Sequence, residues 1–438
     1  MNKFTIKSVH ARRVWDSRGE PTIETEVTLR YGAHGRAITP AGASKGSGEV
    51  LDLRDGGKAF GGRDVMKAVS AIKTEIAPAL NGLDAREQTD IDKILIELDG
   101  TKERSRIGGN AITATSMAVL NAAASAEKLP LWRYLAEVHG NNETLSLPLP
   151  EIQIFGGGVH AAKRVDVQDF MVIAIAATSY AEALEWSAEI YRHAGILMEN
   201  TGRLHGVADE GGFWPAFNSN EEAIETLIQA IECAGFTPGQ EIALSLDIAA
   251  SEFGKNGHYT LACDDRVLDS DSLSGLLVDW IERYPIISIE DPLAEDDIEG
   301  FTKFTWAVGK RVQVVGDDFL VTNAKHVAKA AKLNACNALL VKPNQAGTIT
   351  ETKAALDMAE KHGYTSIISA RSGETADPTI VHLAVGWGVK QIKVGSFSRS
   401  ERMVKWNEEI RIAEAIGQLK HTRPEGALPA QNTFPWIP

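Results

Sequence analysis

Cysteine is scarce in this sequence, which limits the roles that disulfides or cysteine-bound metals can have. The 438 residues include three cysteines, Cys233, Cys263 and Cys336. They lie far apart, are odd in number and show no Cys-x-x-Cys spacing, so neither a disulfide framework nor a zinc knuckle is expected. This cysteine usage fits a reducing compartment.

Long hydrophobic runs are also missing. No stretch approaches the roughly 20 apolar residues that a membrane-spanning helix needs. Residues 1–10 alternate polar and apolar side chains like a strand, and they lack the long apolar segment of a signal peptide. We therefore expect the protein to be cytoplasmic.

Positive charge is in deficit, because 45 Lys and Arg residues face 59 Asp and Glu residues and leave a formal net charge of −14. Such a surface repels a polyanion on average, so nucleic acid is not an expected partner. A small anionic substrate remains compatible if cations gather in one cleft. The Gly-rich stretches 55–62 and 155–160 lack the G-x-x-x-x-G-K-[ST] pattern, so a nucleotide site is not expected either.

The first part of the chain predicts an α+β domain over residues 1–140. Residues 3–15 and 21–30 have the alternation of strands. Helical patterns follow over 65–80, 88–98 and 109–127. The Gly-, Ala- and Ser-rich segment 38–50 is expected to be a mobile loop, and residues 139–150 have the composition of a linker.

The second part, residues 141–438, predicts a β/α barrel that makes the whole chain an α/β protein. Short apolar runs alternate there with helical patterns, as in a parallel sheet that is buried on both faces. Six of these runs end at or near a polar residue: Asp247, Glu290, Asp317, Lys342, Arg371 and Lys393. In a barrel, the carboxyl ends of the strands form one mouth, where the chemistry takes place. The Pro-rich residues 423–438 are expected to form an irregular tail.

Three of these residues are carboxylates that indicate a metal site. Asp247, Glu290 and Asp317 would repel each other at one mouth unless a cation joined them. An all-oxygen site favours Mg²⁺, Mn²⁺ or Ca²⁺ over zinc. The alternative is that each acid caps the helix after its strand.

The basic residues suggest proton transfer and anion binding. Lys342 or Lys393, beside another cation and a divalent metal, would have a depressed pKa and could act as a base. Arg371 with Ser372 could anchor a phosphate or a carboxylate. The alternatives are lysines that extend to solvent and an arginine that pairs with a loop acid. A metal triad with a neutral lysine suits removal of a proton α to a carboxylate, which leaves an ene-diolate that the metal stabilises.

Nine segments, in the right order along nearly the whole chain, resemble enolases. They are WDSRGEPTIETEV, IELDGT, GVADEGGFWP, SLDIAASEF, ISIEDPLAEDD, VGDDFLVTN, LLVKPNQAGTITET, RSGETAD and QIKVGSFSRSER. The resemblance implies an α+β capping domain followed by a modified TIM-type barrel. It also implies a homodimer or higher homo-oligomer and two Mg²⁺ ions per site, one conformational and one catalytic.

The resemblance also implies a role for each matched residue. Asp247, Glu290 and Asp317 would hold the first Mg²⁺, and Ser44 would join the second when its loop closes. Lys342 would remove the C2 proton, while Lys393 would bind the substrate carboxylate. Arg371 and Ser372 would bind the phosphate. Glu210 would assist departure of the C3 hydroxyl, and His160 would lie on a loop that closes over the substrate.

This sequence departs from the enolase pattern at several matched positions. Ala370 replaces a His, Asp169 replaces a catalytic Glu one methylene longer, and Gly156 replaces an Asn. Lys45 replaces a Thr in the loop and is expected to add positive charge for substrate binding. Gly48 and Pro343 also differ from the pattern. We expect a roomier pocket.

These departures leave three functions open. The first is dehydration of 2-phosphoglycerate to phosphoenolpyruvate by a Mg²⁺-dependent lyase. The second is enolate formation on a related phosphorylated or phosphonate hydroxy acid. The third is a non-catalytic, enolase-like binding protein.

Overall fold

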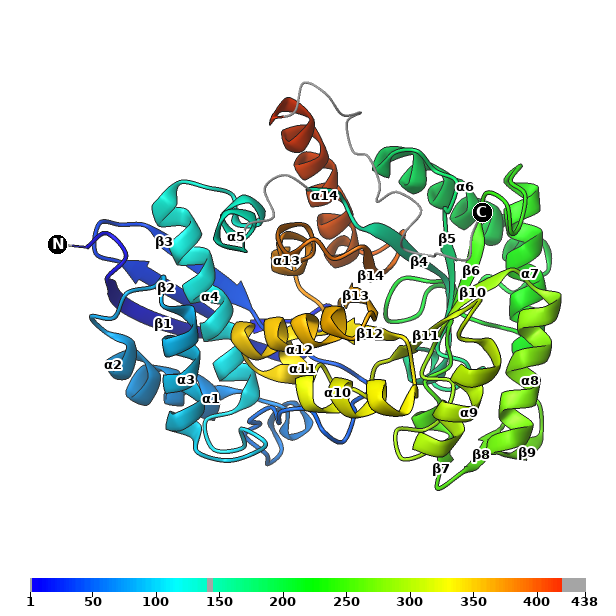
Figure 1. The fold of residues 1–438 in the computed structure, drawn as a ribbon, viewed down its shortest axis with the longest axis horizontal. Coiled ribbons are helices and arrows are strands. Elements are labelled where there is room, and N and C mark those ends of the chain that lie inside the picture. Colours follow the sequence, from blue (N-terminus) through cyan, green and yellow to red (C-terminus); the bar gives the residue numbers. More distant parts are fainter. Residues whose placement is uncertain (1, 140–144, 420–438) are drawn as a thin grey trace.

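The computed structural model describes residues 2–139 and 145–419 and shows two arrangements of strands and helices side by side (Figure 1). The expected tail at 423–438 lies outside the described residues, as does part of the expected linker. Among the described residues, no helix combines the length and the apolar character needed to cross a membrane.

The N-terminal region is a three-stranded antiparallel sheet covered by helices. Its strands are β1 (Ile6–Trp15), β2 (Pro21–Leu29) and β3 (His34–Ile38). Its helices are α1 (Met66–Ala71), η2 (Ile72–Ile76), α2 (Ala77–Leu80), α3 (Gln88–Asp99), α4 (Gly109–Glu127) and α5 (Leu131–His139), and a short turn, η1 (Ala59–Gly62), precedes them. The two predicted strands and three predicted helices are confirmed, whereas β3 and α5 were not predicted.

The alternation in β2 explains how the sheet packs. Ile23 and Val27 are fully buried, because every second side chain of a strand points to the same face. That face contacts α4. Helix α4 is rich in alanine and buried along most of its length, because it lies between this sheet and the barrel helices α11 (Pro343–Ala346) and α12 (Ile349–Lys361).

The second region is a closed eight-stranded barrel. In chain order its strands are β4 (Leu149–Gly156), β5 (Asp169–Ile173), β6 (Ala243–Asp247), β10 (Ile286–Glu290), β11 (Gln313–Gly316), β12 (Ala338–Val341), β13 (Thr365–Ser369) and β14 (Gln391–Ser396). The six runs with polar ends are all barrel strands and all run parallel. Strand β5 is antiparallel to both β4 and β6, so a uniformly parallel sheet is the wrong expectation at this strand.

Helices surround the barrel, and a small sheet extends from it (Figure 1). The helices not yet given are α6 (Tyr180–Asn200), α7 (Asn220–Cys233), α8 (Ser270–Arg283), α9 (Ile298–Val308), α10 (Ala324–Leu333), α13 (Thr379–Trp387) and α14 (Ser400–Leu419). The small sheet contains β7 (Gly254–Lys255), β8 (His258–Leu261) and β9 (Arg266–Asp269), and short turns form at η3 (Gly158–Ala161) and η4 (Ala250–Glu252).

Helix capping decides one of the alternatives from the sequence. The helices that follow β6, β10 and β11 are capped by Asp269, Asp297 and Asn323, whose side chains accept hydrogen bonds from the first-turn amides. The suggestion that the predicted metal-binding acids serve as helix caps is therefore wrong. The carboxylates of Asp247, Glu290 and Asp317 are therefore not used as caps of these helices.

A layer of buried polar side chains fills the barrel below its mouth. Gln391 Nε2 donates to Glu151 Oε1 at 2.6 Å and to Gln313 Oε1 at 3.1 Å. Ser245 Oγ donates to Glu151 Oε2 at 3.3 Å. Burial outweighs the hydrogen bonds from Gln391 and Ser245 and the charge of the nearby Lys393 ammonium. It therefore raises the pKa of Glu151 to about 7. Glu151 is thus a costly charge inside the barrel above neutral pH.

We expect Glu151→Gln to remove a pH-dependent loss of stability. The pKa of this carboxyl rises from 4.5 unfolded to about 7 folded. The folded protein therefore holds a proton that the unfolded chain releases between these values, and its stability falls as pH rises through that window. The full effect is about 3 kcal/mol at most, since one pKa unit corresponds to about 1.4 kcal/mol.

Urea unfolding of metal-free protein at about pH 5 and about pH 8 measures this effect. The wild type should lose more stability between the two pH values than Glu151→Gln does. Glu185→Gln, which changes an exposed glutamate of α6, is the matched control and should behave like the wild type. Equal pH dependence in the wild type and Glu151→Gln would contradict the burial argument.

Candidate active site

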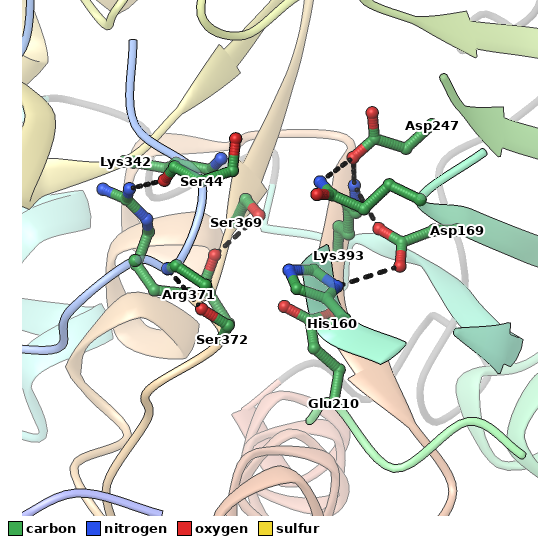
Figure 2. Close-up of a pocket in the computed structure, with 14 residues that line it drawn as sticks. Ser44, His160, Asp169, Glu210, Asp247, Lys342, Ser369, Arg371, Ser372 and Lys393 are labelled. Atoms are coloured by element: carbon green, nitrogen blue, oxygen red, sulfur yellow. Dashed lines mark hydrogen bonds and ion pairs between the residues drawn. The ribbon is translucent and has the colours of Figure 1, made fainter. Parts of the chain in front are cut away.

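A pocket lies where the carboxyl ends of the barrel strands meet the loop around Ser44 (Figure 2). Most of the predicted site residues line it: Ser44, His160, Asp169, Glu210, Asp247, Lys342, Arg371, Ser372 and Lys393. Figure 2 shows Ser44 and Arg371 on one side and Asp247, Asp169 and His160 on the other. Residues from both regions of the chain therefore meet at one mouth.

Of the three predicted metal-binding carboxylates, Asp247 lines this pocket, whereas Glu290 and Asp317 are not among its lining residues; all three contact lysines that line it. Asp247 and Glu290 are register partners at the ends of β6 and β10. Lys393 Nζ lies 2.8 Å from Asp247 Oδ2 and 2.8 Å from Glu290 Oε2. Lys342 Nζ lies 2.5 Å from Asp317 Oδ2. The structure thus brings the three acids and both lysines together, while their roles stay predictions.

These carboxylates fit a divalent cation. Glu290 Oε1 is buried and has no hydrogen-bond partner among the described residues. Burial and the neighbouring Asp247 carboxylate raise the pKa of Glu290 well above its usual range. A cation at this oxygen would give it a partner and favour the ionised carboxylate, and a donor set made of carboxylate oxygens suits Mg²⁺. Asp247, Glu290 and Asp317 are the residues that would hold it.

The expected depressed lysine pKa is not found in this state. The pKa of Lys342 is raised: burial would lower it, but the Asp317 carboxylate overcomes that effect. The pKa of Lys393 lies well above its usual range, because the carboxylates of Asp247 and Glu290 outweigh its burial. The prediction for Lys342 assumed a bound metal ion, whereas here the lysines themselves neutralise the acids.

Asp169 lies beside His160 and Lys393. Its Oδ2 is 3.0 Å from Lys393 Nζ, and its Oδ1 is 3.5 Å from His160 Nδ1. Gln153 Nε2 also donates to Asp169 Oδ1. Asp169 reaches the mouth because β5 runs backwards, so that its first residue lies level with Asp247. Burial opposes charge on His160, but Glu210 and Asp169 raise the pKa of the imidazole overall.

Arg371, the predicted phosphate anchor, is paired with a loop acid. Its two terminal nitrogens lie 3.1 Å from the two carboxylate oxygens of Glu49, and Nη2 donates to the Ser44 carbonyl at 2.9 Å. The alternative of an arginine paired with a loop acid is therefore what the structure shows. Ser372 Oγ accepts from the Ala43 amide at 2.7 Å. The segment expected to be mobile is thus held against the barrel here.

Two of the expectations drawn from the sequence departures concern Lys45 and Ala370. Lys45 does not line the pocket, because its ammonium pairs with Asp52 at 3.2 Å; its part in substrate binding stays a prediction. Ala370 lines the pocket, but the cavity measures only about 20 Å³. That volume holds about one water molecule. Ser44 and both lysines line this small cavity, and the expectation of a pocket roomier than the family pattern stays a prediction.

Several supporting residues were missed in the sequence. Asp291 accepts from the amides of Asp317 and Asp318 at 2.9 and 2.8 Å. Arg402 is fully buried and donates to the carbonyls of Arg371 and Ser372 at 2.7 and 2.6 Å. The available signals were the Asp next to Glu290 and a basic residue on the apolar face of the last helix, but neither pattern is specific by itself.

Comparisons with known proteins agree with this geometry. A family model described as "Enolase, N-terminal domain" matches residues 6–135, and one described as "Enolase, C-terminal TIM barrel domain" matches residues 144–426. Enolase 1 of Desulfitobacterium hafniense (strain Y51) is 46% identical over 433 residues, which cover 98% of each chain. These matches span the N-terminal sheet with its helices and the closed barrel, including the barrel mouth where the acids and lysines meet. The chain therefore belongs to the enolase family, the phosphopyruvate hydratases, which are carbon–oxygen lyases.

Proposed function

We propose that this mouth dehydrates 2-phosphoglycerate to phosphoenolpyruvate and that Lys342 removes the proton from C2. The observation that carries the proposal is that two buried lysines, each paired with carboxylates, line one pocket together with Arg371 and Ser372 (Figure 2). This placement gives one pocket a base, cations for a carboxylate and a phosphate, and acids for a metal ion. The name of the similar enolase supports the same substrate.

Substrate binding uses the two sides of the pocket. Lys393 binds the substrate carboxylate, and the guanidinium of Arg371 with the hydroxyl of Ser372 binds the phosphate. Glu49 must then share or release Arg371, since it contacts both of its terminal nitrogens. The loop around Ser44 has to open to admit the substrate, because the present cavity holds about one water molecule.

Proton removal depends on Lys342 losing its own proton. Asp317 holds that ammonium in the present state. Asp247, Glu290 and Asp317 would hold a Mg²⁺ ion, which would supply positive charge to stabilise the ene-diolate. With its carboxylate partner engaged elsewhere, Lys342 would lose the interaction that raises its pKa and could hold a neutral amine.

Departure of the C3 hydroxyl takes place on the other side of the pocket. The C2–H electrons form the new C2–C3 double bond, and the C3–O bond breaks as the oxygen is protonated and leaves as water. Glu210 is the proposed proton donor, with His160 and Asp169 beside it. Asp169 reaches less far than a glutamate, which leaves space for a water molecule between its carboxylate and the substrate.

Further features of the family are proposed for this chain. Ser44 is the residue that would join a second Mg²⁺, and its Oγ lies 3.5 Å from Asp318 Oδ2. Two copies of the chain would form a homodimer or a higher homo-oligomer, and the cytoplasm is the proposed location. The proposed domain boundary stays at residue 140.

Ala370 keeps a second substrate under consideration. A histidine at this lining position would project into the pocket, whereas alanine leaves that space open once the loop moves. A phosphorylated or phosphonate hydroxy acid larger than 2-phosphoglycerate would use the same lysine and metal chemistry. The first prediction below separates the two substrates.

We expect the purified protein with Mg²⁺ to convert 2-phosphoglycerate at ordinary enzyme rates, about 1–10³ per second. Chelation should abolish the activity, and added Mg²⁺ should restore it, because the acids that stabilise the ene-diolate site need the cation. Absorbance of the enol product measures the rate. Turnover of a larger phospho-acid alone would favour the second substrate, and no turnover of either would favour a binding protein.

We expect Lys342→Ala to lower exchange of the C2 hydrogen with deuterated solvent by about 10²–10⁴-fold or more, because the general base is lost. Nuclear magnetic resonance of 2-phosphoglycerate in deuterated buffer follows this step separately from dehydration. Lys303→Ala, which changes an exposed lysine of α9 paired with Asp271 and Glu299, is the matched control and should exchange normally. Unchanged exchange in Lys342→Ala would remove the base assignment.

A further inference from the structure

A buried glutamine connects two separate segments of the pocket wall. Gln153 lies on β4, and its side chain is fully buried. Its Nε2 donates to Asp169 Oδ1 at the start of β5, and its Oε1 accepts from the Gly212 amide at 2.8 Å. Gly212 lies just after Glu210 in the loop between α6 and α7. The oxygen and the nitrogen of one side-chain amide thus each hold a segment that carries an acid of the pocket.

The turn that carries Glu210 is bonded both to itself and to β4. The Ala208 amide donates to the Gly212 carbonyl at 2.7 Å, which closes the turn. The Phe213 amide donates to the Ile154 carbonyl at 2.8 Å, which joins the end of the turn to β4. A closed turn moves as a unit, so a side chain that holds its Gly212 amide also helps to set the position of Glu210.

The carboxylate of Asp169 is held from two sides (Figure 2). Lys393 Nζ lies 3.0 Å from Oδ2, and the Gln153 amide donates to Oδ1. Asp169 is one methylene shorter than the glutamate of the enolase pattern, so its carboxylate lies further back from the substrate. A carboxylate that acts across a water molecule depends on a fixed direction, because small errors in position cost large factors in rate.

Two glycines leave the space in which the glutamine amide lies. A Cβ atom at Gly156 would lie 3.2 Å from both Nε2 and Oε1 of Gln153 and 2.7 Å from Ala208 Cβ. A Cβ atom at Gly212 would lie 2.5 Å from Gln153 Oε1. Gly156, which replaces an asparagine of the enolase pattern, is also the register partner of Asp169. Two of the departures from that pattern therefore meet at one side chain.

We infer that Gln153 is a positioning residue that sets Asp169 and Glu210 relative to each other on the side of the pocket where the hydroxyl leaves. Gln153 is not among the residues that line the pocket, so it acts through these two acids. This role rests on the proposed function, in which Glu210 protonates the C3 hydroxyl with Asp169 beside it. The proposed base, Lys342, pairs with Asp317 instead. Loss of the glutamine amide should therefore slow dehydration and spare removal of the C2 proton.

Gln153→Met tests this separation, because methionine has a similar length and makes neither hydrogen bond. We expect dehydration of 2-phosphoglycerate to fall about 10²-fold, the cost of a displacement of about 1 Å. Exchange of the C2 hydrogen with deuterated solvent should stay close to that of the wild type. Gln313→Met, which changes a fully buried glutamine of the polar layer below the mouth, is the matched control. It should leave the ratio of dehydration to exchange unchanged, even if it lowers stability.

A paired substitution tests the same role by rescue. Gln153→Asn combined with Asp169→Glu moves one methylene from the amide to the acid and keeps the total length of the connection between β4 and β5. Each single substitution should slow dehydration, because the connection becomes too short or too long. The double variant should be faster than the two single effects multiplied together predict, since residues in contact do not act independently. Damage to packing alone would not be reversed by the second change.

Crystal structures of the wild type and of Gln153→Met give an answer that does not depend on turnover. The Asp169 carboxylate or the turn over residues 208–212 should be displaced in the variant. If Gln153→Met does not fold, Gly156→Ala takes its place, because its new Cβ would press on Ala208 at the base of the same turn. This variant should lower the same ratio of dehydration to exchange.

The positioning role would be overturned if Gln153→Met lowered dehydration and exchange equally, or if the Asp169 carboxylate and the turn kept their places in the variant structure. Purely multiplicative effects in the double variant would also overturn it. Wild-type protein that neither exchanges nor dehydrates 2-phosphoglycerate would fail only the proposed function, because the two structures still decide whether Gln153 positions the acids. Turnover by the wild type with unmoved acids in the variant would fail only the positioning role.

Discussion

Charge compensation at the barrel mouth is the constraint on which the rest of the site depends. Lys393 lies within 3.0 Å of oxygens from Asp169, Asp247 and Glu290, and all four side chains are buried. Several carboxylates without a cation could not stay ionised at such depth. The lysine therefore lets the acids share one mouth before metal or substrate arrives. The protonation states of the proposed base and of the proposed metal ligands are therefore coupled.

The N-terminal region completes this mouth from outside the barrel. The loop around Ser44 brings Glu49 onto Arg371, and Ala41 pairs with Gly373 through two backbone hydrogen bonds of 2.9 Å each. From the other side, Arg402 in α14 holds the carbonyls of Arg371 and Ser372. The segment proposed to bind the phosphate is thus held by one long helix and covered by one loop. In the proposed reaction, the part held by the helix would stay in place while the loop opens.

Most of the fold was predictable because its signals are local. The alternation in β1 and β2, the helical patterns before residue 127 and the apolar runs of the six parallel strands all correspond to elements of the structure. Strand β5 was missed because residues 169–173 form a short apolar run, and nothing within it indicates that the strand runs against its neighbours. Strand β3 and helix α5 are similarly short.

The site was predictable as a set of residues but not as a set of contacts. The strand ends identified Asp247, Glu290, Asp317 and the two lysines, because parallel strands bring their carboxyl ends together. The pairing of Arg371 with Glu49, the position of Lys45 beside Asp52 and the support from Gln153 depend on tertiary packing. Sequence spacing does not contain that information, since the partners of Arg371 and Gln153 lie far away along the chain.

Gly42 lies where the loop meets the arginine. A Cβ atom at this position would lie 1.9 Å from Arg371 Nη2. Two non-bonded heavy atoms cannot come this close, so one of them would have to move. A missing side chain is therefore what lets the covering segment come to rest on the guanidinium. A larger residue at position 42 would push the loop away from Arg371. It would therefore disfavour the closed position of the loop, even though every proposed catalytic group is unchanged.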